Sequence, residues 1–445
     1  MVLLTNSISK KPDVVQSIVS LQEASLLLDV APAIIRRWEK KSLLRAKHVV
    51  KAKRFYDLEE LKMVHHTNSG GESDIKFQVL KNEKTNYSAI ELFSGCGGMA
   101  LGFENAGLNT KLLVEVDKNC VATLKLNRPQ WQVIHSDISN VDFKAYEGQV
   151  DIVAGGFPCQ AFSYAGHSRG FEDIRGTLFF EFARCVQEVM PRIALAENVR
   201  GLIEHDKGKT LATMKQVLEG LGYHVSYKLL KGQFLDIPQK RERLVIIGVR
   251  NDQNVEAFFP KEKSYTIAVR AALKDCPLST GAEYPPRKKE IMALVPPGGY
   301  WRDLPEELQK EYMKKSLYLG GGKTGMARRL SWDEPSLTLT CSPAQKQTER
   351  CHPSETRPLN IREYARIQSF PDDWQFSGST ASQYKQIGNA VPVNLAYHLG
   401  RCLISMLNKQ FDAETMDLAM PHKLIERKEE CTQLLQLDLG FDDQH

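Results

Sequence analysis

The sequence predicts an α/β protein built on a doubly wound, Rossmann-like sheet, with an irregular second lobe and a small N-terminal helical domain. Three observations predict this arrangement. Apolar strand-like runs alternate with helical stretches from Ser88 to about residue 250. That alternation stops over residues 251–360, where proline and glycine pairs are frequent. Residues 1–87 carry the whole surplus of positive charge, with 15 Lys/Arg against 10 Asp/Glu, in a chain whose net charge is +5.

The N-terminal domain is expected over residues 1–67. Ser20 and Glu23 have the spacing of a helix capping box, and Pro32 stands in the first turn of a second helix. Residues 36–54 hold nine basic side chains against one acid, which favours a polyanionic partner. The runs 34–39 (IIRRWE) and 54–58 (RFYDL) resemble the winged helix-turn-helix headpiece of MerR-type regulators and excisionases. That resemblance implies DNA contacts from the second helix and the wing, through Arg36, Arg37, Lys53 and Arg54. A small helical domain with a charged surface is the alternative.

A polar linker follows over residues 68–86, and the main domain is expected over 87–250. Its predicted strands are 89–93, 111–116, 132–134, 150–154, 193–196, 225–230 and 244–249. The irregular lobe takes residues 251–374, the chain returns to the main domain over 375–409, and residues 410–445 form a tail.

The first strand runs into a glycine loop, in which Gly95, Gly97 and Ala100 match the relaxed dinucleotide pattern G-x-G-x-x-A. Glu115 ends the second strand, where a carboxylate can bind ribose hydroxyls, and Asp137 follows the third strand, where it can accept a hydrogen bond from an adenine amine. At this point an NAD-dependent enzyme is a competing interpretation.

Four further motifs carry reactive or charged groups. Cys159 follows Gly-Gly-Phe-Pro, directly after a strand, on a turn that can present a thiol to a substrate. Glu197 ends another strand, so it should meet Cys159 at the carboxyl edge of an open parallel sheet. Arg241 and Arg243 alternate on one face of a strand. The run 386–393 (QIGNAVPV) forms a polar turn before a late helix.

Together these motifs resemble those of the DNA cytosine-5 methyltransferases, in order and spacing, from about Ser88 to Arg401; the runs 176–180 (GTLFF) and 362–371 (REYARIQSFP) add to the match. The resemblance implies S-adenosylmethionine as cofactor, with S-adenosylhomocysteine as product. It implies a cofactor site made of Phe93, Ser94, Gly95, Gly97, Gly98, Glu115, Val116, Asp137, Ile138, Pro158, Leu178, Asn389, Ala390 and Val391. Val116 stands where many relatives carry an aromatic residue.

The resemblance also implies the chemistry. Cys159 would attack carbon 6 of cytosine, Glu197 would share a proton with ring nitrogen 3, and Arg241 would hold oxygen 2. Arg243 is expected to support the loop, bind phosphate or make a structural ion pair. The target base must be flipped out of the duplex, and residues 160–175 would close over it. Expected DNA contacts are Gln160, Ser163 and Arg169 in that loop, and Arg328 and Arg329 in the recognition lobe.

Double-stranded DNA is thus the expected partner, and a cognate restriction endonuclease would be a genetic partner. The headpiece would add DNA affinity, extend recognition, or repress a promoter such as the protein's own. Nine scattered cysteines, the absence of metal-type spacing and the lack of an 18-residue apolar run predict a cytoplasmic protein with no metal site and no membrane segment. Two further alternatives are an RNA cytosine methyltransferase and a non-catalytic DNA-binding regulator on the same scaffold.

Overall fold

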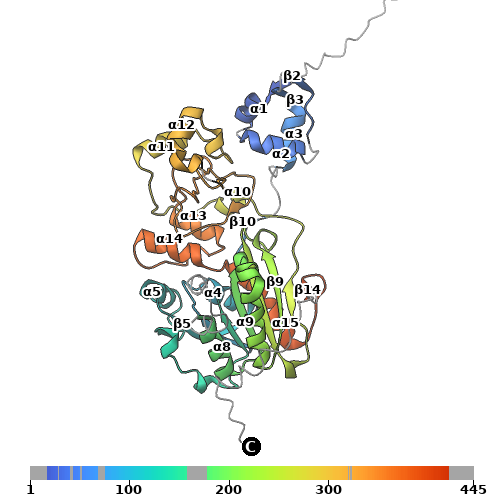
Figure 1. The fold of residues 1–445 in the computed structure, drawn as a ribbon, viewed down its shortest axis with the longest axis vertical. Coiled ribbons are helices and arrows are strands. Elements are labelled where there is room, and N and C mark those ends of the chain that lie inside the picture. Colours follow the sequence, from blue (N-terminus) through green and yellow to red (C-terminus); the bar gives the residue numbers. More distant parts are fainter. Residues whose placement is uncertain are drawn as a thin grey trace, which may run out of the picture.

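The computed structural model describes residues 18–28, 30–40, 44–50, 53–68, 76–157, 178–318, 320 and 323–419. Three parts are seen in Figure 1: the N-terminal headpiece in blue, the lobe expected over residues 251–374 in yellow to orange, and the domain that contains the large sheet. The headpiece and α11 (Pro286–Ala293) and α12 (Glu306–Met313) of the lobe stand side by side at the end away from the sheet domain.

The centre of the sheet domain is a seven-stranded sheet, and each of its strands falls on a predicted run. In spatial order the strands are β6 (Val133–His135), β5 (Asn109–Glu115), β4 (Ser88–Leu92), β7 (Ile152–Gly155), β8 (Ile193–Val199), β11 (Glu242–Arg250) and β9 (Tyr223–Lys231). The order reverses between β4 and β7, as in doubly wound folds. The predicted Rossmann-like fold of this domain is confirmed.

One strand runs against the others, which corrects the expectation of an all-parallel sheet. β11 pairs antiparallel with both β8 and β9. Its connection from β9 spans residues 232–241 and contains no α-helix, whereas a parallel return needs a crossover of a dozen or more residues. The reversal has a functional consequence, because it brings the start of β11 to the edge where the parallel strands end.

Helices cover both faces of the sheet. α4 (Gly98–Ala106) and α15 (Val393–Asn408) pack on one face, where Ile152 and Ala154 point. α8 (Leu178–Val189) and α9 (Lys209–Gly220) pack on the other face with Val153. Strands covered on both faces are apolar throughout, which explains the continuous apolar runs in the sequence. No helix within the described ranges is long and apolar enough to cross a membrane.

The lobe has an apolar cluster of its own, which includes Trp301, Met313 and Cys351. Its helices are α10 (Val269–Leu273), α11 (Pro286–Ala293), α12 (Glu306–Met313) and α13 (Ile361–Ile367), and α14 (Thr380–Asn389) leads back to the sheet domain beside α5 (Lys118–Asn127). β10 (Gln239–Lys240) pairs with β13 (Ser336–Leu337) and joins the lobe to the sheet domain. β12 (Phe258–Pro260) pairs with β14 (Met416–Leu418) on the core of the sheet domain, so residues 257–260 pack there and not in the lobe.

Short 3-10 helices fill several connections: η1 (Ile138–Asn140), η2 (Lys144–Tyr146), η3 (Arg200–Ile203), η4 (His205–Gly208), η5 (Gly232–Phe234), η6 (Asn251–Gln253), η7 (Trp301–Asp303) and η8 (Lys314–Leu317).

The headpiece contains β1 (Ile18–Ser20), α1 (Leu21–Leu27), α2 (Pro32–Lys40), β2 (His48–Val50), β3 (Lys53–Asp57) and α3 (Leu58–Asn68). The capping box is present, since the Ser20 side chain accepts from Glu23 N (3.3 Å) and the Glu23 carboxylate accepts from Ser20 N (2.8 Å). The helices fall where the sequence predicts them. A DNA-binding role for this domain stays a prediction.

A buried carboxylate fixes the connection between β9 and β11. Asp236 accepts hydrogen bonds from Lys263 Nζ (2.5 Å) and Tyr265 Oη (2.6 Å), and pairs with His398 Nε2 on α15 (2.8 Å). Burial by itself raises the pKa of Asp236, but these hydrogen bonds outweigh it and hold the pKa well below its usual value. The ionised carboxylate therefore ties this connection to α15.

Candidate active site

The loop after β4 depends on glycine at successive positions. Gly95 has φ +53° and Gly97 has φ +88°, in the left-handed region that favours glycine. A Cβ on Gly98 would lie 2.2 Å from the carbonyl oxygen of Val391, so the loop packs directly on the turn after α14. The structure thus brings Gly98 together with Ala390 and Val391, three residues that were expected in one site. Gly95 faces open space, with no atom within 4 Å of a Cβ placed there.

Glu115 ends β5 beside this loop, and three backbone N–H groups fix its carboxylate. Oε2 accepts from Gly95 N (2.6 Å), while Oε1 accepts from Val116 N (2.9 Å) and Asp117 N (2.8 Å). The side chain of Val116 next to it is exposed. A fixed carboxylate and an uncovered apolar surface therefore lie together at the carboxyl end of β5.

Asp137 lies two residues past the end of β6, on the strand that neighbours β5. Its exposed carboxylate accepts from Ser139 Oγ (2.7 Å) and Ser139 N (2.9 Å), and these hydrogen bonds lower its pKa. Ile138 is buried beneath it. Asp137 is therefore an ionised hydrogen-bond acceptor at the same edge of the sheet as Glu115.

These groups fit a nucleoside cofactor. Glu115 can accept hydrogen bonds from a ribose diol, Val116 can support a base, and Asp137 can accept from an exocyclic amine; the space beside Gly95 leaves room for the ligand. Two further predicted residues, Phe93 and Ser94, directly precede Gly95 in the loop after β4. The Ser94 hydroxyl is buried and donates to Glu91 O (3.0 Å), and the ring of Phe93 packs edge-on to Phe157 with 6.4 Å between centroids. Ser94 thus supports the loop.

The other residues of the predicted cofactor site sit at the margins. Leu178 begins α8 and is partly buried against the core, and Asn389, at the end of α14, is exposed. The Asn389 amide oxygen accepts from Cys341 Sγ at 3.0 Å. Within the described part of the chain, no group of three His, Cys, Asp or Glu side chains could hold a metal ion.

A second cluster forms where β8 ends and β11 begins. Glu197 Oε1 and Arg243 Nε are 2.5 Å apart, and the two side chains are only 10% and 12% exposed. The antiparallel register places Val245 opposite Glu197, so Arg243 lies two residues nearer the open edge of the sheet. A largely buried carboxylate and guanidinium thus contact each other at the same edge of the sheet as Glu115 and Asp137.

The chain that leads to Cys159 begins against this pair. A Cβ on Gly156 would lie 3.1 Å from Glu197 Oε2, and Asn198 Nδ2 donates to Phe157 O (3.1 Å). Residues 158–177 lie outside the described residues, and with them Pro158, Cys159, Gln160, Ser163 and Arg169. Cys159 is nevertheless only two residues beyond the anchored Phe157.

Arg241 lies deeper than Arg243 and binds main-chain carbonyls. Its guanidinium, 2% exposed, donates from Nη1 to Leu339 O and from Nη2 to Gly388 O and Ala390 O, all at 3.2 Å. Burial lowers its pKa, and the nearby cation Arg243 lowers it further. Arg241 therefore joins β10, the lobe and the end of α14, whereas Arg243 is the arginine that contacts Glu197. The structural ion pair was one of the roles expected for Arg243, whereas Arg241, expected to hold the base, binds main-chain carbonyls.

A cavity of about 330 Å³ opens beside this cluster. Its lining residues come from the end of β8, the β9–β11 connection and the lobe: Val199, Arg200, Gly201, Lys231, Gln233, Lys240, Arg241, Glu242, Arg243 and Thr338. Small-molecule sites usually measure about 300–1,000 Å³, so the space is at the lower end of that range.

The two arginines predicted to contact DNA from the lobe both donate to main-chain carbonyls of the lobe. Arg329 is 3% exposed and donates to several carbonyls, among them Met292 O (2.7 Å) and Glu355 O (3.1 Å). Arg328 donates to Gly298 O (2.7 Å) and lies over the ring of Tyr300. The prediction of surface contacts is corrected for Arg329, because a buried guanidinium whose donors bind carbonyls organises the lobe instead.

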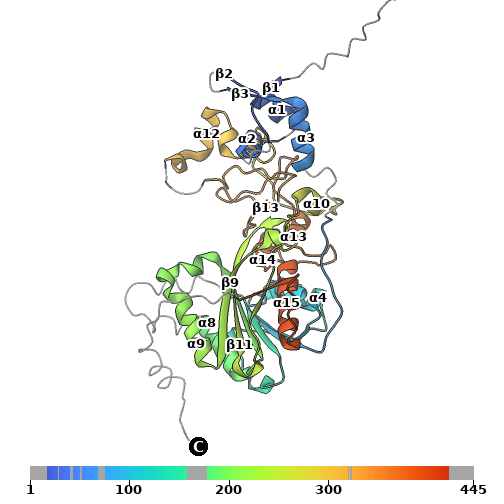
Figure 2. The same cartoon turned by 90° about the vertical axis from the view of Figure 1, so that its right-hand side faces the viewer.

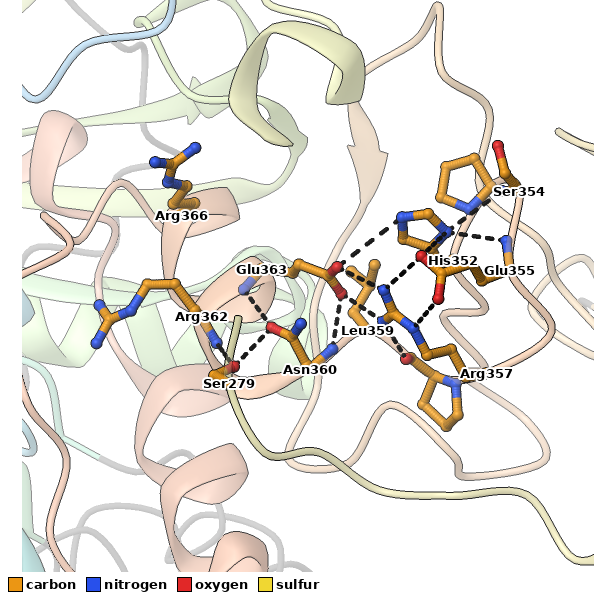
Figure 3. A network of polar contacts seen from close by, with 12 residues as sticks. Ser279, His352, Ser354, Glu355, Arg357, Leu359, Asn360, Arg362, Glu363 and Arg366 are labelled. Carbon is orange, nitrogen blue, oxygen red and sulfur yellow. Dashed lines mark hydrogen bonds and ion pairs between the residues drawn. The ribbon is translucent and has the colours of Figure 1, made fainter. Parts of the chain in front are cut away.

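Within the lobe, a polar network joins α13 to the segment that precedes it (Figure 3). Arg357 binds both oxygens of Glu363 (2.8 Å each), and Glu363 also accepts from Asn360 N (2.8 Å). His352 accepts from Glu355 N (3.0 Å) at the other end of the network. The network therefore fixes the start of α13 to residues 352–357 of the same lobe.

The four basic residues predicted to contact DNA from the headpiece are all exposed, but two of them make ion pairs within the chain. Arg37 pairs with Glu334 of the lobe, and Arg54 pairs with Glu39. Arg36 and Lys53 are the other two of these exposed basic residues. Arg37 faces the lobe, which corrects the expectation that α2 presents it to DNA.

Sequence reasoning missed several residues that shape the site. Gly156 and Asn198 lie inside the Cys159 and Glu197 motifs. Their closeness in sequence to these two residues could have indicated that they also shape the site. Glu334, which binds Lys240 Nζ (2.7 Å) and Arg37, had no such signal, because its partners are far away in the sequence.

The doubly wound sheet, its nucleoside-type groups and the adjoining Glu197–Arg243 pair define an enzyme that uses a nucleoside cofactor. A family model for C-5 cytosine-specific DNA methylase matches residues 87–405, and the chain belongs to that family. It is a C-5 cytosine-specific DNA methyltransferase. This excludes the dehydrogenase alternative.

Relatives of known type agree with this assignment. The chain is 53% identical over 401 residues to the Type II methyltransferase M.Eco47II of Escherichia coli, covering 88% of this chain and 96% of that one. It is 61% identical over 332 residues to M.PspPI of Psychrobacter sp. (strain TA137), covering 72% and 80%. The M.Eco47II match is longer than residues 87–445, so it extends into the first 86 residues.

Among solved structures, a prophage-encoded DNA modification methyltransferase of E. coli has a TM-score of 0.54 at 24% identity, covering 73% of this chain and all of the other. Spodoptera frugiperda DNMT2 has a TM-score of 0.52 at 15% identity, covering 72% and 100%. At these identities the likeness concerns the fold alone.

Proposed function

We propose that this protein transfers a methyl group from S-adenosylmethionine to carbon 5 of a flipped cytosine, within a specific short sequence of double-stranded DNA. The observation that carries the proposal is the meeting of two groups at one edge of the sheet. Glu115 offers a fixed carboxylate beside the glycine loop, and the Glu197–Arg243 pair lies where the chain enters the Cys159 segment. The Type II methyltransferases among its relatives support a role as the modification enzyme of a restriction–modification system.

The cofactor supplies an electrophilic methyl group on a sulfonium centre, and the residues around the glycine loop would hold and orient it. Glu115 would accept from the ribose hydroxyls, Asp137 from the adenine amine, and Val116 would support the adenine ring. The turn at Ala390 and Val391 packs on Gly98 and would close the pocket behind the ligand. S-adenosylhomocysteine is the product.

Cytosine carbon 5 is a weak nucleophile, so the ring must be activated first. The Cys159 thiolate would add to carbon 6 while a proton is shared between Glu197 and ring nitrogen 3, which turns the ring into an enamine with a nucleophilic carbon 5. After carbon 5 takes the methyl group, a base removes its proton, the bond between sulfur and carbon 6 breaks, and the thiolate is regenerated. The ring returns to aromaticity with one methyl group added and one proton lost.

In this proposal the arginines exchange the roles expected from the sequence. Arg243 would donate to oxygen 2 of the cytosine, because its guanidinium already lies on the Glu197 carboxylate at the cavity. Arg241 would hold the cavity wall through its three carbonyl acceptors. A low-dielectric site strengthens both the Glu197 and the Arg243 contacts to the base.

Flipping follows from the position of the target atoms, which are inaccessible inside a duplex. Residues 160–175, including Gln160, Ser163 and Arg169, would close over the flipped base. The lobe of residues 251–374 would read the flanking bases. The headpiece would add DNA affinity, or let the protein repress a promoter such as its own.

Bisulfite sequencing of DNA from a host that expresses the protein tests this proposal. We expect one short sequence to be methylated at one cytosine, and no methylation with Cys159→Ser. Methyl transfer to tRNA in preference to duplex DNA would favour the RNA methyltransferase alternative. DNA binding without methyl transfer by the unaltered protein would favour the regulator alternative.

A further inference from the structure

The headpiece is docked on the recognition lobe through helix α2. Figures 1 and 2 both show the headpiece against the lobe, at the end away from the sheet. Ala31 N, just before α2, donates to Pro297 O at 2.9 Å. A Cβ on Gly298 would lie 2.8 Å from Ile34 Cδ1, so the α2 side chain packs directly on the glycine of the Pro297–Gly298 turn. The contact thus combines a main-chain hydrogen bond with close apolar packing.

Charged side chains reinforce the contact. Arg37 of α2 pairs with Glu334, and His65 of α3 lies 3.9 Å from Asp333. Two neighbouring acids of the lobe therefore contact side chains from two different helices of the headpiece. Asp333 also binds Arg270 (2.9 Å) of α10, which fixes this acidic pair to the lobe.

Glu334 connects the headpiece to the cavity wall. Its Oε1 pairs with Arg37, and its Oε2 accepts from Lys240 Nζ at 2.7 Å. Lys240 lines the cavity and directly precedes Arg241.

The segment that follows Glu334 also binds residues 238–240, through hydrogen bonds to their main-chain carbonyl oxygens. Ser336 N donates to Pro238 O (2.8 Å), and Thr338 Oγ1 donates to Lys240 O (2.7 Å). One carboxylate therefore lies between the headpiece and the strand that forms the cytosine pocket.

We propose that Glu334 is a positioning residue, and that the docked headpiece sets the orientation of the recognition lobe relative to the cytosine pocket. Through Glu334, the headpiece holds β10 and β13 in register while the lobe binds DNA. Helix α2 serves as a protein contact through Ile34 and Arg37, and the wing formed by β2 and β3, where Lys53 is exposed, would face DNA. This inference rests on the proposed function, because the pocket it positions is the cytosine pocket.

Loss of the Glu334 ion pairs should lower kcat more than it lowers the stability of the fold. Glu334 and its two partners are partly exposed, with side chains 27–48% accessible, so solvent screens their pairs and the fold does not depend on them. Catalysis is more sensitive, because a shift of about 1 Å in a reacting group can cost about 100-fold in rate.

The test uses the full-length protein and unmethylated plasmid DNA. Glu334→Gln and Arg37→Gln should each lower kcat about tenfold, with the KM for S-adenosylmethionine unchanged. The double variant should be no slower than the slower single variant, because both substitutions break the same link. Glu59→Gln is the matched control, since it removes the exposed Glu59–Lys62 pair of α3 and should leave kcat unchanged.

Hydrogen exchange gives a second measurement that does not depend on activity. In Glu334→Gln and Arg37→Gln, the amides of residues 30–40 and 296–300 should exchange faster than in the unaltered protein or in Glu59→Gln. Normal kcat in both single variants, or additive losses in the double variant, would overturn the inference. If the unaltered protein transfers no methyl group, the proposed function fails instead, and the exchange result still reports whether the docking contact exists.

Discussion

Replacing each of the paired arginines by lysine separates the one that holds the pocket wall from the one proposed to act on the base. In Arg241→Lys, a single ammonium group cannot reach both Leu339 and the end of α14, so one or two of three hydrogen bonds are lost. Hydrogen bonds to charged groups contribute about 1.5–3 kcal/mol each, so the free energy of unfolding should fall by about 2–5 kcal/mol. For a chain of 445 residues, a loss of this size corresponds to a drop in Tm of roughly 2–5 °C.

Arg243→Lys should have the opposite profile. The substitution keeps a positive charge opposite Glu197, so the drop in Tm should be less than half of that in Arg241→Lys. It removes the planar donor group proposed for oxygen 2 of the cytosine. Loss of one preorganised donor typically lowers kcat about 100- to 1,000-fold, and we expect a loss in that range.

The assay is transfer of a tritiated methyl group to unmethylated plasmid DNA, with thermal unfolding measured on the same samples. Arg250→Lys is the control, because Arg250 ends the same strand β11 at its other end and binds Asp252 there (2.7 Å). The reasoning is refuted if Arg243→Lys retains full turnover, or if Arg241→Lys loses turnover with an unchanged Tm.

Three further substitutions test other parts of the structure. Asp236→Asn should lower stability at pH 7 by about 3 kcal/mol, as expected for breaking a buried ion pair. The pKa of Asp236 in the folded protein lies below its value near 4 in the unfolded chain. The stability that the ionised carboxylate contributes is therefore present above about pH 4 and is lost as the pH falls through the folded pKa. The Tm of Asp236→Asn should therefore fall less on acidification than the Tm of the unaltered protein. Glu115→Gln should raise the KM for S-adenosylmethionine about 10- to 100-fold with little change in the KM for DNA, measured by initial rates. Gly98→Ala should cost about 1–3 kcal/mol in chemical unfolding, since the new Cβ meets Val391 O.

The sequence was sufficient to predict all seven strands of the sheet. The central strands are buried on both faces and leave apolar runs, while the edge strands β6 and β9 are only partly buried and leave shorter ones. It also placed Glu115, Asp137 and Glu197 at strand ends, where side chains from distant segments meet. The direction of β11 could not be predicted in this way, because periodicity gives the identity of a strand and not its sense. The short connection between β9 and β11 was the available signal, since it is too short for a crossover helix.

The remaining corrections concern charged side chains. Alternation correctly placed Arg241 and Arg243 near each other, but the acceptors of Arg241 are carbonyls from segments about 100 to 150 residues away in the sequence. Arg329 and Arg37 were expected to contact DNA, because the sequence around a basic residue in a polar loop or helix does not show which distant group it will bind. The structure supplies those partners: carbonyls of the lobe for Arg329, and Glu334 for Arg37.

Trapping the enzyme on DNA that contains 5-fluorocytosine at the methylated position tests the central claim most directly. Fluorine at carbon 5 cannot leave as a proton does, so the reaction should stop after methyl transfer with the Cys159 sulfur still bonded to carbon 6. We predict a complex that survives denaturation, forms only when S-adenosylmethionine is added, and yields on proteolysis a modified peptide containing Cys159. Methylation of ordinary DNA by Cys159→Ser, or an adduct at another residue, would contradict the mechanism.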